Sequence, residues 1–212
     1  MTTPLQRSTS SDPKTAAMTG LRSTLAGFGQ VLTAAKQRVA TPMIDSLEVM
    51  YHTELQDLQS TQFQACTVAE EVWVDMHDDA LAQRVSDYAA QMRLRHVYLE
   101  DLLARLAPKT RLHPDKAMRA LARETSRIAD TCSEDVRDAA WTAALQRIIH
   151  QMIASYGTVA AHAKALGRTQ EAAWFAECAD QEKAADAELS ALAKNTLNLQ
   201  AIASEKARQA ND

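Results

Sequence analysis

Glycine and proline are scarce in this sequence of 212 residues, with five of each, and aromatic residues make up only 5% of it. So few glycines and prolines leave few places where a helix must end and few of the tight turns that sheets need. Alanine, leucine, glutamine, arginine and glutamate are abundant instead, and these residues have high helix propensity. The composition therefore predicts an all-α protein whose core volume comes from aliphatic side chains and methionines.

Long apolar runs and closely spaced cysteines are also missing. No stretch of about 18 apolar residues occurs, and no apolar segment follows a basic start as in a secretory signal. The three cysteines, Cys66, Cys132 and Cys178, are odd in number and far apart. This pattern favours buried thiols in a reducing compartment over a disulfide framework or a zinc site. We therefore expect a cytoplasmic protein without a transmembrane segment.

The charge is unevenly distributed along the chain. The whole chain carries a formal charge of −4, yet the part before Asp45 holds five basic residues and a single acidic one. An acidic body does not suit nucleic-acid binding, whereas a basic extension could contact a protein partner or an anionic surface. The Ser-, Thr- and Arg-rich composition of this extension also resembles a transit peptide. Apolar residues at helical spacing predict an additional N-terminal helix there, and its stripe needs a surface to bury it: Leu21, Leu25, Phe28, Leu32, Ala35 and Val39.

Proline positions and apolar spacing define the remaining helices. All five prolines lie outside the periodic stretches, and Thr41 followed by Pro42 is typical of a helix start. The predicted long helices cover about residues 42–76, 79–107, 133–166 and 168–196, with a shorter helix at about 115–129. Gly167 is placed to end the third long helix, and Gly157 inside it predicts a close approach of a neighbouring helix.

Four long helices with one longer central connection are typical of a four-helix bundle with a crossover. We expect a basic extension over residues 1–40, the bundle over 41–196 and a mobile polar tail over 197–212.

Ionisable side chains interrupt the apolar stripes on three helices. Glu54 lies in the first stripe and Glu182 in the fourth, while Arg95, with Gln91 one turn before it, lies in the second. A buried carboxylate costs several kcal/mol unless it binds a metal or pairs with a cation. Two-metal bundles solve this with glutamates and Glu-x-x-His motifs, but none of the six histidines here is preceded by that motif.

Three stretches carry motifs, 146–158 in the third helix, 181–189 in the fourth and 50–54 in the first. These motifs resemble those of the YciE/YciF ferritin-like family, and the resemblance extends over about residues 43–193. It implies a ferritin-like bundle linked to bacterial stress responses, with core glutamates as candidate metal ligands.

By this resemblance, Glu54, Glu182 and His150 match the family pattern. Gln91, Ile149 and Met152 occupy positions where the family has glutamate. The resemblance therefore implies a vestigial metal site formed by Glu54, Glu182, Gln91 and His150.

Three hypotheses follow. In the first, the protein is a non-catalytic bundle without a cofactor, in which Arg95 bridges Glu54 and Glu182 in place of metal. In the second, the remaining ligands hold iron or manganese and support redox or metal-handling activity. In the third, the protein is an interaction module that uses its N-terminal helix. The sequence contains no nucleophile-elbow or phosphate-loop pattern that indicates an enzyme, and bundles of this kind often form homodimers.

Overall fold

The computed structural model describes residues 43–106 and 114–210, and every regular element in these ranges is helical. The chain forms α2 (Leu47–Val72), a 3₁₀ turn (Trp73–Asp75), α3 (Asp79–Leu106), α4 (Lys116–Ser126), α5 (Ile128–Thr131), α6 (Glu134–Ala165) and α7 (Thr169–Leu192), then a π-helical turn (Ala193–Leu197) and α8 (Asn198–Gln209). The predicted all-α class is confirmed. The expected N-terminal helix lies outside the described residues.

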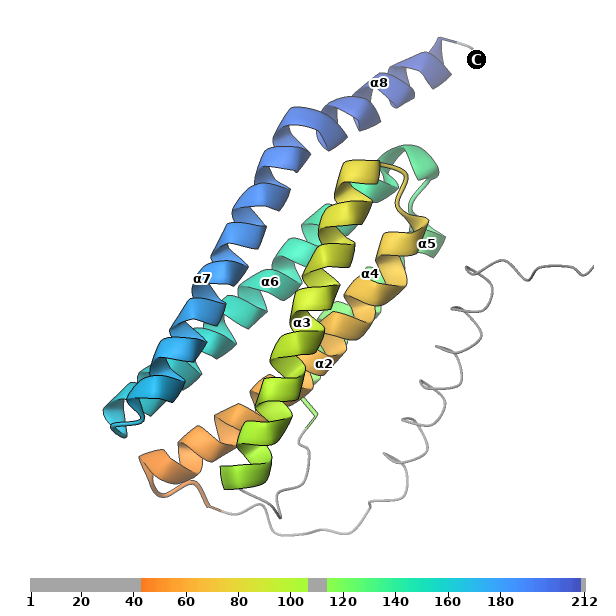
Figure 1. Ribbon diagram of the computed structural model, residues 1–212. Coiled ribbons are helices and arrows are strands. Elements are labelled where there is room, and N and C mark those ends of the chain that lie inside the picture. The colour runs from red at the N-terminus through yellow and green to blue at the C-terminus, as the bar shows by residue number, and fades with distance from the viewer. Residues whose placement is uncertain (1–42, 107–113, 211–212) are drawn as a thin grey trace, which may run out of the picture. The chain divides into compact units, whose positions relative to one another are not determined.

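The four long helices form a bundle built from two helical hairpins, α2 with α3 and α6 with α7 (Figure 1). Helix α2 also packs against α6, while α4 covers both of them in the crossover between the hairpins. The backbones of α3 and α7 come close at few positions, so long side chains must fill the space between these two helices. This space contains the polar groups described below.

Aliphatic residues and methionines fill most of the core, as the composition predicts. Met92, Met118 and Met152 are fully buried, and four larger side chains complete the packing: Trp141, Tyr51, Tyr156 and Phe175. Burial of each large side chain contributes about 1.5–3 kcal/mol. The four aromatic residues come from α2, α6 and α7, so this packing holds both hairpins together.

Carboxylates at two junctions fix the ends of the helices. Asp115 accepts hydrogen bonds from the backbone N–H groups of Ala117 and Met118, which caps α4, and from the Thr61 hydroxyl on α2 at 2.6 Å. Asp138 on α6 accepts bonds from the backbone N–H groups of His77 and Asp78, in the loop before α3. Each carboxylate satisfies backbone donors that a helix end or loop leaves free.

Several predicted details need correction. Helix α2 begins at Leu47, because the Ser46 hydroxyl caps it by accepting from the Val49 N–H. No neighbouring atom lies within 4 Å of a Cβ built at Gly157, so the predicted close helix approach is wrong. Gly167 does end α6, with a φ of +74° that favours glycine.

The C-terminal segment is not a mobile tail over its described length. After Leu192 the helix widens into the π-helical turn and then continues as α8. Leu197 is buried, and α8 packs on α6, where Arg208 pairs with Asp135 at 2.9 Å. The buried Leu197 and these contacts hold α8 in a helical conformation although its sequence is largely polar.

Candidate functional site: a buried arginine–glutamate pair

The centre of the site is the carboxylate of Glu182 on α7, which is completely buried. Tyr88 and Arg95 are seven residues apart on α3, so they lie two turns apart on one face of that helix. The Tyr88 hydroxyl donates to Oε2 of Glu182 at 2.7 Å, and Nη1 of Arg95 donates to Oε1. Both carboxylate oxygens therefore have a partner on α3, across the wide gap between the two helices.

Arg95 reaches this position with 7% of its side chain exposed. Its second terminal nitrogen, Nη2, donates to the side-chain oxygen of Gln181 at 2.8 Å. Its guanidinium carbon lies 5.8 Å from the centre of the Tyr156 ring on α6, within the range of a cation–π contact. One arginine thus connects three of the four long helices.

Burial and charge act in opposite directions on this pair. Burial raises the pKa of Glu182, and the Arg95 cation and the Tyr88 hydroxyl partly offset that rise. Burial also opposes the charge on Arg95, but the Glu182 carboxylate keeps the pKa of the guanidinium above its ordinary value. Burial, then the nearby carboxylate, raise the pKa of Tyr88 well above its usual range. The geometry of the site is that of an ion pair between Arg95 and Glu182 with a tyrosine donor on the second carboxylate oxygen.

A second polar chain runs beside the ion pair. The Tyr156 hydroxyl donates to the side-chain oxygen of Gln62 on α2, and the Gln62 amide donates to the backbone carbonyl of Met92 on α3 at 2.7 Å. Gln62 is fully buried, so these bonds satisfy groups that would otherwise destabilise the core. The sequence did not identify Gln62, Tyr88 or Tyr156 as polar groups of the core.

Glu54 lies outside this site. Arg95 bonds to Glu182 and not to Glu54, so the predicted bridge from Arg95 to both glutamates does not form. Glu54 is only half-buried on α2. Burial, followed by the charge of Asp57, raises its pKa, while His162 on α6 acts in the opposite direction. One α-helical stripe is too broad for spacing alone to distinguish its centre from its edge. The guanidinium therefore neutralises Glu182 alone.

The other two positions of the predicted vestigial site point outward. Gln91 is exposed on α3. His150 is 65% exposed on α6, and its Nε2 lies 3.2 Å from Asp186 on α7. The four predicted positions do not converge, and the described residues contain no group of three or more His, Cys, Asp or Glu side chains placed to hold a metal ion. The residues present do not fit a two-metal centre.

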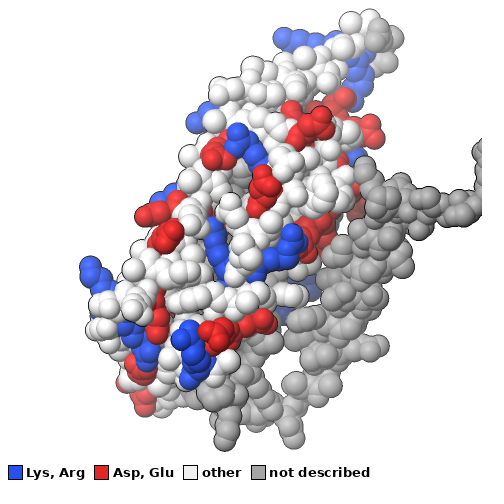
Figure 2. Space-filling view, in the orientation of Figure 1, with Lys and Arg blue, Asp and Glu red and all other residues white. Residues whose placement is uncertain are grey.

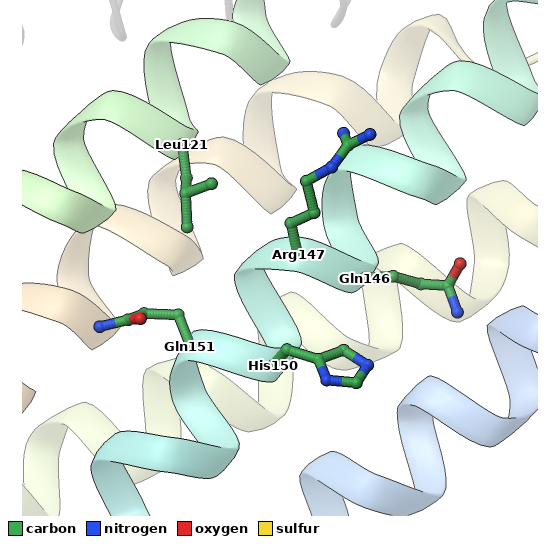
Figure 3. Close-up of a pocket in the computed structure, with 5 residues that line it drawn as sticks. All are labelled: Leu121, Gln146, Arg147, His150 and Gln151. Atoms are coloured by element: carbon green, nitrogen blue, oxygen red, sulfur yellow. The ribbon is translucent and has the colours of Figure 1, made fainter.

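His150 instead borders a shallow surface depression between α4 and α6, formed with Leu121, Gln146, Arg147 and Gln151 (Figure 3). The side chains of these residues point in different directions, and Gln146 is bonded to Asp186 at 2.9 Å. Acidic and basic side chains are mixed over the face shown in Figure 2, without a large field of one sign. Neither surface has the convergent groups of a ligand site.

The described chain is thus an all-α helical bundle whose polar centre is bonded internally. None of its described helices combines the length and the apolar character needed to cross a membrane. The model of a family described as a domain of unknown function (DUF892) matches residues 46–202, and the chain belongs to that family.

Comparison with known proteins gives two relatives in this fold. Protein YciF of Escherichia coli (strain K12) is 41% identical over 86 residues, which cover 40% of this chain and about half, 52%, of YciF. The crystal structure of the E. coli stress protein YciF matches with a TM-score of 0.67 and 26% identity, over 73% of this chain and 99% of YciF. The YcfI protein of Rhodopseudomonas palustris matches with a TM-score of 0.65 and 22% identity, over 71% of this chain and 96% of that protein, and shows the shared fold.

Proposed function

We propose that this protein is a non-catalytic, stress-related bundle protein in which an arginine–glutamate network fills the position of a vestigial metal site. The observation that carries the proposal is the complete burial of Glu182 with Arg95 and Tyr88 on its two oxygens. A carboxylate bonded in this way has no free oxygen directed at a cavity. An adjacent guanidinium also repels a divalent cation.

The stress-related part of the proposal comes from the relative. YciF is described as a stress protein, and this chain shares its fold and family. A role in stress would require the abundance of this protein to rise when its host meets osmotic, oxidative or heat stress. Quantitative mass spectrometry of stressed and unstressed cultures measures that change, and a constant abundance under all three conditions contradicts this part.

The absence of metal chemistry is tested by elemental analysis. We expect protein expressed with added iron and manganese, and reloaded with Fe²⁺ or Mn²⁺ without oxygen, to hold well below one equivalent of metal per chain. The matched variant is Glu182→Gln, which removes the one fully buried carboxylate among the described residues. Stoichiometric iron or manganese in the wild type that disappears in Glu182→Gln would support the alternative, a residual metal-binding protein.

The proposed working form is a homodimer. Bundle proteins that expose apolar helix faces commonly bury them against a second copy, and exposed apolar side chains are present on several helices here. The alternative of an interaction module rests on the basic N-terminal extension, which lies outside the described residues. Deletion of residues 1–40 tests it, and an unchanged oligomeric state and unchanged partner binding would contradict it.

A further inference from the structure

The outward face of α3 carries a seam of five exposed residues that alternate at spacings of four and three: Ala90, Leu94, Val97, Asp101 and Ala104. Leu94 is 75% exposed and Val97 is 64% exposed, although both are large apolar residues. The opposite, inward face of the same helix carries the buried core residues and Arg95. Spacings that alternate in this way are those by which helices pair in coiled coils.

We infer that a second copy of this chain docks on this face, with the two α3 helices antiparallel about a twofold axis. The inference rests on the homodimer proposed above and identifies its interface. When the axis passes midway between Leu94 and Val97, Leu94 lies opposite Val97 of the second copy and Val97 lies opposite Leu94 of the second copy. Ala90 and Ala104 lie toward the two ends of the seam, where their small side chains permit the helices to approach closely.

The charges beside the seam select the antiparallel arrangement. Arg93 and Glu100 lie on one flank, and Asp87 and Arg105 lie on the other. In an antiparallel pair each flank of one helix faces the same flank of the second helix. Arg93 therefore lies opposite Glu100 of the second copy, and Asp87 lies opposite Arg105 of the second copy. The twofold axis repeats both pairs, which gives four attractive contacts. A parallel pair would instead set the two flanks opposite each other, where only Glu100 and Arg105, five residues apart, meet as opposite charges, which gives two attractive contacts.

The contacts of these groups within one chain do not prevent the pairing. Arg93 bonds to Glu70 at the surface, and Arg105 lies 3.1 Å from Asp101 with both side chains more than half exposed. Exposed ion pairs of this kind contribute little to the stability of a single chain. Their charges remain free to act across an interface, where burial of Leu94 and Val97 supplies the main driving force.

The first experiment is sedimentation equilibrium of the full chain over a wide range of concentrations. We expect the wild type to dimerise and the double variant Leu94→Glu/Val97→Glu to be monomeric with unchanged helical content. The matched control is Leu199→Glu on α8, which changes a residue that is 59% exposed and should leave the dimer intact. A monomeric wild type at every concentration overturns both the homodimer and this interface. A dimer that persists in Leu94→Glu/Val97→Glu overturns the interface alone.

A charge reversal tests the orientation. Asp87→Arg should raise the dimer dissociation constant roughly tenfold or more, because it places like charges together twice in each dimer. The second change Arg105→Asp, made in the same chain, restores opposite charges and should return the dissociation constant close to that of the wild type. Failure of the double reversal to restore dimerisation would overturn the antiparallel arrangement. Neither outcome affects the metal analysis above.

Discussion

Replacing Arg95 with methionine tests the role of the buried pair most directly. The variant keeps a long apolar side chain but leaves the Glu182 carboxylate, which has no exposed surface, without its cation. Loss of one partner from a buried ion pair costs about 3–5 kcal/mol. For a domain of this size that corresponds to a fall in Tm of about 6–20 °C. Urea unfolding at pH 7, followed by circular dichroism, measures the free energy directly.

Arg84→Met is the matched control, since it changes the same residue type on the same helix. Arg84 also pairs with a glutamate of α7, Glu188, but 45% and 59% of the two side chains are exposed. We expect Arg84→Met to cost less than about 1 kcal/mol. If Arg95→Met costs no more than this control, the buried pair does not hold α3 to α7.

The cost of Arg95→Met should also depend on pH. Burial already raises the pKa of Glu182, and loss of the arginine removes the group that chiefly opposes that rise. A carboxyl whose pKa is raised in the folded state contributes stability that is fully present below its unfolded-state pKa and is lost as the pH rises through its folded-state pKa. The difference between Arg95→Met and the wild type should therefore be greatest at neutral pH and shrink as the pH falls. Adding Glu182→Gln should recover most of the stability at pH 7, and a cost that is independent of pH would refute the electrostatic explanation.

Three further outcomes are expected from the same structure. Tyr88→Phe leaves one oxygen of the buried carboxylate without its donor and should cost about 1–3 kcal/mol in urea unfolding; a cost near zero would show that water replaces the hydroxyl. Gly157→Ala should stabilise the protein by about 0.5–1 kcal/mol, since nothing obstructs the added methyl group, whereas Gly167→Ala should destabilise it because φ is +74°. Burial raises the pKa of the Cys178 thiol to about 12, so this thiol should react with a thiol reagent at pH 8 only after unfolding; the partly exposed Cys132 should react in the native protein, and equal native rates would contradict this.

The limits of helical periodicity explain where the sequence-based prediction of the site failed. Spacing placed Glu54 and Glu182 in equivalent stripes, but an apolar stripe covers 100° or more of a helix surface. The tilt and rotation of each helix then decided that Glu182 is enclosed while Glu54 is half-buried beside Asp57. The same rotation left Gln91 in solvent. Tyr88 and Gln62 were missed because a buried hydroxyl or amide gives no periodic signal that distinguishes it from packing.

By itself the sequence determined the helical class, the main helix boundaries and the stop at Gly167, because these depend on neighbouring residues through propensity, capping and backbone sterics. It also indicated that a charged residue in a stripe needs a partner, since the cost of an unpaired buried charge does not depend on the fold. Only the tertiary structure decided which partner each charge has. Arg95 and Glu182 are far apart in the chain, and their bond exists because α3 and α7 leave a gap that these two side chains span.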